Sequence, residues 1–318
     1  MGGRRRRSGK RLRPGLRTAG GALLLSLLAV MALLAPGVWP LTGTHTPIDV
    51  DLSLANLPPA SAGHLLGTDF LGRDILCESM WGARASLAVG ILAAGIAVSV
   101  GSLWGAMSAL AGGAVDAVMM RVVDGLLSIP ALVLVLALQS FMSSPQLTAV
   151  LPPAVLAGLA VSPWSHGLMP LATIVLVISA TTWLEAARLA RAQVMTIRSQ
   201  EYVLAARSLG VGRLGMLLRH LLPNAAVPLV VEATLLVSDA VLMEAGLSYL
   251  GLGLGPGIPS WGQMVASAQM SLIDGNWWAA LTPGILISAL VLAVNLLGEG
   301  WLEVTGSRHH RVAAQPGA

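Results

Sequence analysis

Long apolar stretches recur along this chain, and they limit the folds that it can adopt. An α-helix needs about 20 mainly apolar residues to cross the roughly 30 Å hydrocarbon core of a bilayer. Only 11% of the 318 residues are charged and 55% are hydrophobic, which leaves too little polar surface to cover a soluble globule. The sequence therefore predicts an all-α integral membrane protein with six transmembrane helices, whose apolar parts are residues 19–38, 87–110, 125–141, 171–184, 224–249 and 278–297.

One polar segment, residues 201–224, interrupts these apolar stretches and carries three arginines. We call it the arginine-rich segment. Ser199 is the expected N-cap of a first short helix, residues 210–212 supply the turn after it, and Pro223 is expected to end a second short helix. The pattern predicts a helix-turn-helix that lies outside the bilayer.

The distribution of charge predicts which side of the membrane each segment occupies. Basic residues dominate around the arginine-rich segment, and residues 1–18 hold eight basic residues and no acid. The positive-inside rule places both regions, and the tail with Arg308 and Arg311, in the cytoplasm. These flanks explain the net charge of +4, so it does not indicate a nucleic acid partner. The expected parts are a cytoplasmic tail (1–18), the first transmembrane helix (19–40), an external loop (41–83), a five-helix core (84–306) containing a cytoplasmic loop (185–223), and a second cytoplasmic tail (307–318).

Two stretches allow more than one interpretation. Residues 142–170 hold an apolar run that is too short to cross a bilayer and contains Pro152 and Pro153, so we interpret them as a re-entrant or interfacial piece on the external side. The first apolar stretch could be a cleaved secretory signal. However, residues 36–40 lack a clear small-x-small cleavage site, which favours a retained membrane anchor.

Several motifs resemble those of one family of membrane proteins. The arginine-rich segment fits the pattern E-Y-V-x-A-A-x-x-L-G followed by R-H-x-L-P-N. Further motifs are H-x-L-G-T-D-x-L-G-R-D at residues 64–74, G-A-R-x-S-L at 82–87, V-D-A-V-M-M-R-V-V-D at 115–124, and L-S-Y-L-G-L-G with P-S-W-G at 247–262. In their order and spacing they resemble the inner-membrane permease subunits of bacterial ABC importers for dipeptides, oligopeptides and nickel, specifically the C-type permease.

This resemblance implies a type I ABC importer permease fold with both termini cytoplasmic, and a set of partners. We expect a second, related permease, two cytoplasmic ATP-binding subunits, an external solute-binding protein, and the lipid of the cell membrane that the chain crosses several times. ATP would bind to the partner subunits, so we expect no cofactor in this chain and no enzymatic activity. The histidines are scattered along the sequence and predict no metal site.

The resemblance also implies that the arginine-rich segment contacts the ATP-binding subunits, a role called coupling. Small residues such as Ala205, Ala206 and Gly210 let a partner approach the backbone closely. An apolar face for burial is expected from Leu209, Leu214, Leu217 and Leu218. The expected coupling residues are Glu201, Tyr202, Ala205, Ala206, Leu209, Gly210, Arg219, Pro223 and Asn224.

The chain departs from the family pattern in two places. Leu204 stands where the general motif often has a glutamate, which puts a polar contact from that position in doubt. A literal Glu-Ala-Ala occurs earlier, at Glu185, Ala186 and Ala187, but its spacing to Gly210 is wrong. We therefore exclude this earlier copy from the coupling site.

Charged residues inside membrane spans are candidates for function because their burial in lipid is costly. Asp239 and Glu244 lie in the fifth apolar stretch and are candidates for the translocation path, although Glu244 could equally have a structural hydrogen-bonding role. The charges of the external motif could pair with one another or receive a delivery protein, and their closeness in sequence favours pairing. This motif comprises Gly67, Thr68, Asp69, Gly72, Arg73 and Asp74.

The sequence thus predicts the permease subunit of an ATP-driven importer. Dipeptides or oligopeptides are the first substrate class, and nickel or a metal chelate is the alternative. A different class of function is an autonomous secondary transporter that uses Asp239 and Glu244 as a proton relay, but the chain shows no second copy of the six-span pattern. A membrane-anchored scaffold is a third class, and it would not need acidic residues in its fifth span.

Overall fold

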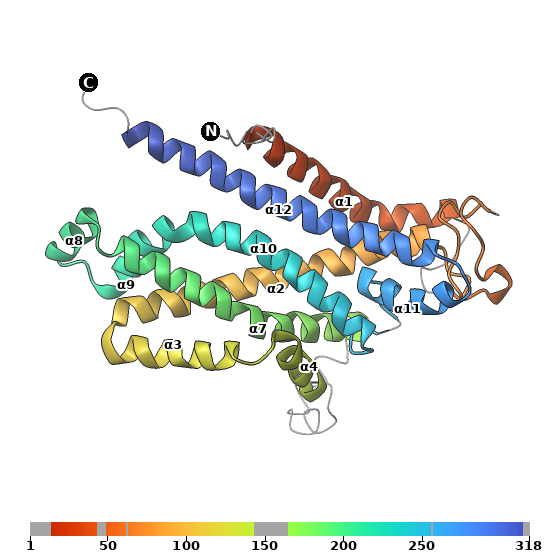
Figure 1. Ribbon diagram of the computed structural model, residues 1–318, viewed down its shortest axis with the longest axis horizontal. Coiled ribbons are helices and arrows are strands. Elements are labelled where there is room, and N and C mark those ends of the chain that lie inside the picture. The colour runs from red at the N-terminus through yellow and green to blue at the C-terminus, as the bar shows by residue number, and fades with distance from the viewer. Residues whose placement is uncertain (1–13, 43–48, 62, 143–164, 256, 314–318) are drawn as a thin grey trace, which may run out of the picture.

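The computed structural model describes residues 14–42, 49–61, 63–142, 165–255 and 257–313 (Figure 1). Apart from two isolated β-bridges, the secondary structure of these residues is helical. Five helical stretches among them are long and apolar enough to cross a membrane, and a sixth arises if one bent pair counts as a single span. The predicted all-α membrane fold is confirmed, whereas the side on which the termini lie stays a prediction.

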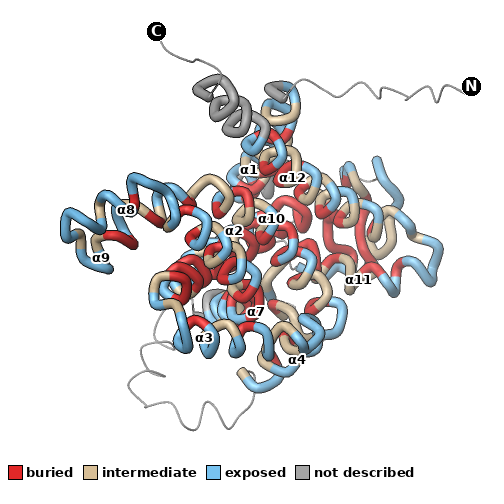
Figure 2. Tube along the Cα trace, turned by 60° about the vertical axis from the view of Figure 1, so that its left-hand side comes forward, coloured by how far each residue is buried: buried red, intermediate tan, exposed pale blue. Residues whose placement is uncertain are grey.

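Three long helices form the centre of the bundle. They are α2 (Ile75–Ala111), α7 (Ser165–Ile197) and α10 (Leu222–Tyr249). Buried residues gather where these helices meet (Figure 2). The fourth and fifth predicted apolar stretches lie within α7 and α10, as expected.

Two glycines let α2 and α7 approach closely. A Cβ atom added at Gly105 would lie 2.1 Å from the carbonyl oxygen of Ala187, and one added at Gly101 would lie 2.5 Å from that of Trp183. Both distances are shorter than real Cβ contacts allow, so only glycine fits. Ala186 and Ala187 on the α7 side are fully buried. The Glu-Ala-Ala sequence that we excluded from the coupling site is therefore part of this helix contact.

The first and last helices, α1 (Pro14–Thr42) and α12 (Trp278–Ala313), lie side by side at the edge of the bundle (Figure 1). A Cβ atom added at Gly21 of α1 would lie 2.7 Å from the carbonyl oxygen of Ala293 of α12. Near the end of this contact, Arg17 Nη1 donates to Glu299 Oε2 at 3.2 Å. The first predicted span is thus a helix that packs against the last one.

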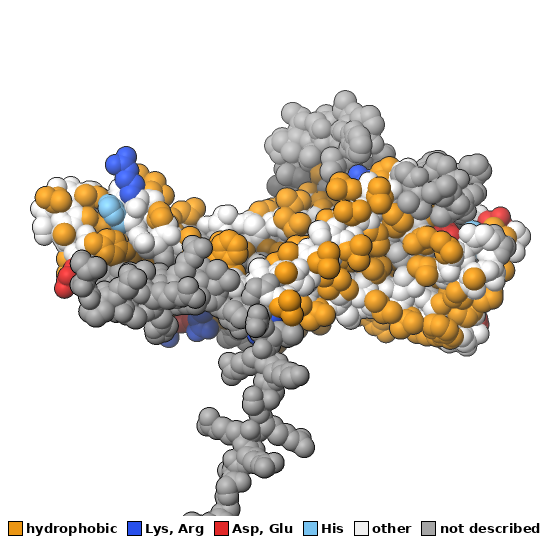
Figure 3. All heavy atoms as spheres, turned by 90° about the horizontal axis from the view of Figure 1, so that it is seen from above, with side chains coloured by type: hydrophobic (Ala, Val, Ile, Leu, Met, Phe, Trp, Pro, Cys, Tyr) orange, Lys and Arg blue, Asp and Glu red, His pale blue; other side chains and the backbone are white. Residues whose placement is uncertain are grey.

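Much of the outer surface is apolar, as the membrane assignment requires. Leu23 and Leu33 of α1 are 72% and 79% exposed. In the space-filling view, hydrophobic side chains cover much of one face of the bundle (Figure 3). Such a face is compatible with lipid rather than with water.

The predicted boundary between the external loop and the core is wrong. α2 begins at Ile75, inside residues 41–83 that we expected to be a loop. Asp74 caps this helix, because its Oδ1 accepts a hydrogen bond from the Cys77 amide at 2.8 Å. The charged Glu78 in the first turn makes this stretch look like a loop in the sequence, yet Glu78 is buried and paired with Arg73.

The third predicted span is not a straight helix. α3 (Gly113–Leu127) and α4 (Ala131–Met142) meet at a bend of 89°. Pro130 stands directly before α4, where it cannot donate a backbone hydrogen bond and disfavours helix at the residue before it. Most of the predicted re-entrant piece, residues 143–164, lies outside the described residues. Residues 165–170 belong to α7.

Two short helices outside the membrane spans escaped prediction. α11 (Trp261–Ile273) lies between the fifth and sixth spans, where we expected only a loop. Ser260 caps α11 by accepting a hydrogen bond from the Gln263 amide at 3.0 Å. The 3₁₀ turn η1 (Leu52–Leu54) lies in the loop before α2 and is capped by Asp51.

The contact between α2 and α7 can be tested by adding one carbon atom. Gly105→Ala is expected to destabilise the bundle by about 1–3 kcal/mol because the new Cβ overpacks the contact. Gly95→Ala is the matched control, since a Cβ atom on this glycine of the same helix meets nothing within 4 Å. Thermal unfolding of the purified chain in detergent measures both variants. Equal unfolding temperatures would contradict the packing described above.

Candidate functional site

The arginine-rich segment folds into the predicted helix-turn-helix. It contains α8 (Glu201–Ser208), a turn, and α9 (Arg213–Met216), and the π-helical turn η2 (Leu217–Leu221) then joins α9 to α10. α8 protrudes at one end of the molecule, opposite the loop of residues 49–74 (Figure 1).

Gly210 closes α8. Its φ of +84° lies in the left-handed region, which glycine adopts without steric cost. Its amide donates to the Arg207 carbonyl, and the Val211 amide donates to the Ala206 carbonyl at 3.2 Å. These bonds satisfy carbonyl groups that the helix end would otherwise leave without partners. A Cβ atom at Gly210 would meet nothing within 4 Å, so the backbone conformation rather than packing requires glycine here.

Two predicted boundaries of this segment are wrong. The N-cap of α8 is Gln200, and Ser199 instead donates its hydroxyl hydrogen to the Thr196 carbonyl at 2.9 Å. Pro223 does not end a helix, because it lies in the first turn of α10, which directly follows the π-helical turn η2. An apolar helical stretch therefore continues from Arg213 to Tyr249.

One face of α8 packs on the bundle. Val203 is fully buried in an apolar cluster that includes Ala109 of α2, Val194 of α7 and Leu221 of η2. Because α2, α7 and the start of α10 all contribute to this cluster, α8 is attached to the three central helices at once.

The opposite face of α8 is exposed. Leu209, directly after the helix, is 86% exposed and Tyr202 is 41% exposed. Ala206 packs partly into the apolar cluster, and Leu217 is buried, so neither belongs fully to the outer surface. The expected coupling residues with exposed positions are Glu201, Tyr202, Ala205, Leu209, Gly210, Arg219, Pro223 and Asn224.

An ion pair and several hydrogen bonds connect the helices beneath α8. Arg191 of α7 donates from Nε and Nη2 to the two carboxylate oxygens of Asp116 of α3, each at 2.6 Å. Ser108 of α2 also donates to Asp116, and Arg198 donates to the carbonyl oxygen of Ala109. Sequence reasoning did not assign a role to this pair, although Asp116 lies in one of the family motifs.

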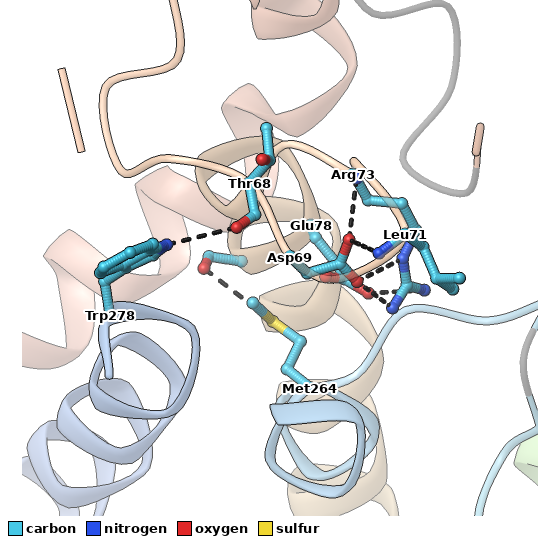
Figure 4. Close-up of polar contacts among 8 residues, drawn as sticks. Thr68, Asp69, Leu71, Arg73, Glu78, Met264 and Trp278 are labelled. Atoms are coloured by element: carbon cyan, nitrogen blue, oxygen red, sulfur yellow. Dashed lines mark hydrogen bonds and ion pairs between the residues drawn. The ribbon is translucent and has the colours of Figure 1, made fainter. Parts of the chain in front are cut away.

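A second polar cluster lies at the opposite end of the molecule (Figure 4). Asp69 accepts hydrogen bonds from the Leu71 and Arg73 amides and from the Arg73 guanidinium, at 2.6–2.9 Å. Arg73 Nη1 also lies 3.0 Å from Glu78 Oε1. Burial by itself would lower the pKa of Arg73, but the carboxylates of Glu78 and Asp69 outweigh it and raise that pKa above its ordinary value. Asp69 and Arg73 of the external motif therefore pair with each other, as their spacing favoured.

The rest of the external motif fixes the loop to the helices. His64 Nδ1 lies 2.6 Å from Asp74 Oδ2, and both residues are buried. The carbonyl oxygen of Thr68 accepts a hydrogen bond from the indole of Trp278 at 3.2 Å (Figure 4). Gly72 has a φ of +78°, and a Cβ atom there would overlap the Asp51 carbonyl. The motif thus connects the loop to the starts of α2 and α12.

Glu244 is fully buried where α10 meets α11. Its Oε1 accepts hydrogen bonds from the hydroxyl groups of Ser248 and Ser260, each at 2.8 Å. A Cβ atom added at Gly262 would lie 2.9 Å from Glu244 Oε2, so a small residue is required beside the carboxylate. This geometry favours the structural role of Glu244 over a role in the path.

Asp239 lies on an exposed part of α10. It lines a hollow together with Glu185 of α7 and residues of α3 and α4. Neither carboxylate forms an ion pair with a basic side chain in the described part of the chain. In the same part, no group of three or more His, Cys, Asp or Glu side chains is arranged to hold a metal ion.

Comparison with known proteins agrees with this architecture. Residues 97–308 match the family "Binding-protein-dependent transport system inner membrane component". The dipeptide transport system permease protein DppC of Bacillus subtilis is 34% identical over 92% of this chain and 82% of its own length. The di/tripeptide permease DppC of Pseudomonas aeruginosa is 36% identical (88% and 84% covered), and the probable D,D-dipeptide permease DdpC of Escherichia coli is 34% identical (89% and 85%). The chain therefore belongs to the family of inner-membrane components of binding-protein-dependent transport systems.

Proposed function

We propose that this chain is the permease subunit of an ATP-driven importer and that it forms, with a second related permease, the translocation path for dipeptides or oligopeptides. The observation that carries the proposal is the protruding helix α8, which exposes one face and packs the other on α2, α7 and the start of α10. The names of the relatives, which are permeases for dipeptides and tripeptides, support the substrate class. Nickel remains the alternative substrate.

The exposed face of α8 is the proposed docking surface for an ATP-binding subunit. Ala205 and Gly210 leave room for a close backbone approach, and Leu209 offers apolar area for burial. When two ATP-binding subunits close on ATP, they would move α8, and the apolar cluster beneath it would pass that movement to the central helices. The path would then change from inward-facing to outward-facing. In this scheme the chain binds no cofactor and breaks no bond in the substrate.

The docking surface can be tested at its most exposed leucine. Leu209→Arg is expected to abolish co-purification of the ATP-binding subunits and to lower transport at least about tenfold, because a charge would enter a desolvated contact. Leu65→Arg is the matched control for co-purification, since Leu65 is 68% exposed in the loop at the end of the molecule away from α8. Unchanged co-purification and transport in Leu209→Arg would rule out docking through this face.

The proposed orientation places α8 in the cytoplasm and the loop of residues 49–74 outside. The beginning of α1 and the end of α12 point toward the α8 end (Figure 1), which supports two cytoplasmic termini. The solute-binding protein would then dock at the opposite end.

Labelling of introduced cysteines tests this orientation directly. Cys77 is the sole cysteine of the chain and is buried, so it gives little background. In intact cells, a membrane-impermeant thiol reagent is expected to label Leu65→Cys but not Ser208→Cys, because only the first position would face outward. Permeabilised cells should show labelling of both. Labelling of Ser208→Cys before permeabilisation would reverse the proposed sides.

Asp239 is the proposed path residue. Its carboxylate is exposed within a span and would attract the protonated amino terminus of a peptide. Asp239→Asn is expected to raise the half-saturating peptide concentration for uptake roughly tenfold, which corresponds to about 1.4 kcal/mol. Asp274→Asn, which removes an exposed carboxylate next to α11, is the control and should leave uptake unchanged. Equal uptake curves for the two variants would remove Asp239 from the path.

A further inference from the structure

A hollow at the base of α8 combines positive charge with apolar walls. It has a volume of about 360 Å³ and is lined by Leu110 at the end of α2, Arg207 of α8, Val211 in the turn, and Arg213 and Met216 of α9. Neither Arg207 nor Arg213 forms an ion pair in the described part of the chain, in contrast to Arg73, Arg188 and Arg191. Two uncompensated guanidinium groups therefore border the same space.

This hollow is separate from the proposed docking surface. Arg207 follows the fully buried Val203 by four residues, so the two residues share the face of α8 that is turned toward the bundle. Glu201 and Ala205 lie on the opposite face. A ligand in the hollow would consequently lie behind α8 and not compete for its outer face.

The position of the hollow indicates the kind of ligand. Leu110 lies at the end of the candidate span Ile75–Ala111, and Arg213 begins the candidate span Arg213–Tyr249. The hollow thus lies where two candidate membrane spans end, on the α8 side of the bundle. A small soluble anion would use the two arginines but not the walls formed by Leu110, Val211 and Met216. A molecule that carries an anionic phosphate next to hydrocarbon matches both.

We propose that this hollow binds the headgroup of an anionic phospholipid. Arg207 and Arg213 would donate charge-assisted hydrogen bonds to its phosphate oxygens, and the apolar walls would contact the glycerol backbone and the first acyl carbons. Such a lipid would fill the space between α8, α9 and the end of α2. The proposal holds whether or not the substrate is a peptide, because it concerns only the membrane boundary.

Native mass spectrometry of the assembled transporter tests the proposal. The transporter is delipidated, mixed with vesicles of phosphatidylglycerol or of phosphatidylcholine, and analysed for retained lipid. Wild type is expected to retain phosphatidylglycerol preferentially, and the double variant Arg207→Gln, Arg213→Gln about tenfold less of it. The matched control is the double variant Arg84→Gln, Arg121→Gln, which removes two exposed arginines outside the hollow and should retain lipid like wild type.

Several outcomes would overturn the inference. One is that the two double variants retain the same amount of phosphatidylglycerol. Another is that wild type retains phosphatidylcholine as well as it retains phosphatidylglycerol. A third is that millimolar inorganic phosphate displaces the phosphatidylglycerol, which would indicate a simple anion site. The single variant Arg213→Gln is expected to retain an intermediate amount of phosphatidylglycerol. The unfolding temperature of every variant is measured as well, so that a loss of lipid binding is distinguished from misfolding. Peptide uptake by wild type is measured in parallel, so that failure of the proposed function is recognised independently.

Discussion

The close contact between α2 and α7 is the interaction on which the rest of the structure depends. Inside a bilayer, apolar side chains gain little by leaving lipid for protein, so helices associate mainly through close packing and polar contacts. Gly101 and Gly105 supply that packing, because they bring the α2 backbone against Trp183 and Ala187. The remaining helices are then arranged around a central contact that tolerates no added carbon atom.

Polar contacts fix the two ends of this bundle. Asp116 and Arg191 connect α3 to α7 beneath α8, and Asp69 and Arg73 with Glu78 fix the loop of residues 49–74 at the start of α2. Each pair lies at a helix end, where charge costs less than at the centre of a span. The bundle thus combines ion pairs near both of its ends with close packing of α2 against α7.

The parts of the fold that follow from local sequence were predictable. Hydrophobic length located five of the predicted spans, and glycine at position 210 marked the end of α8. The start of α2 was missed because Glu78 reads as a solvent-exposed residue, and only its distant neighbour Arg73 makes its burial acceptable. Glu244 was ambiguous for a similar reason, because Ser260, which donates a hydrogen bond to it, is the N-cap of another helix. At these positions, contacts between distant segments of the chain, rather than the local sequence pattern, determine the environment of the carboxylate.

The pairing of α1 with α12 bears on the order in which the protein assembles. α1 is synthesised before α12, yet Gly21 makes its close backbone approach to Ala293 of that helix. Until α12 has been inserted, that surface of α1 has only lipid or other proteins of the membrane as neighbours. The bundle is therefore closed by the final span, and a chain interrupted before that point would leave its first helix without its main partner.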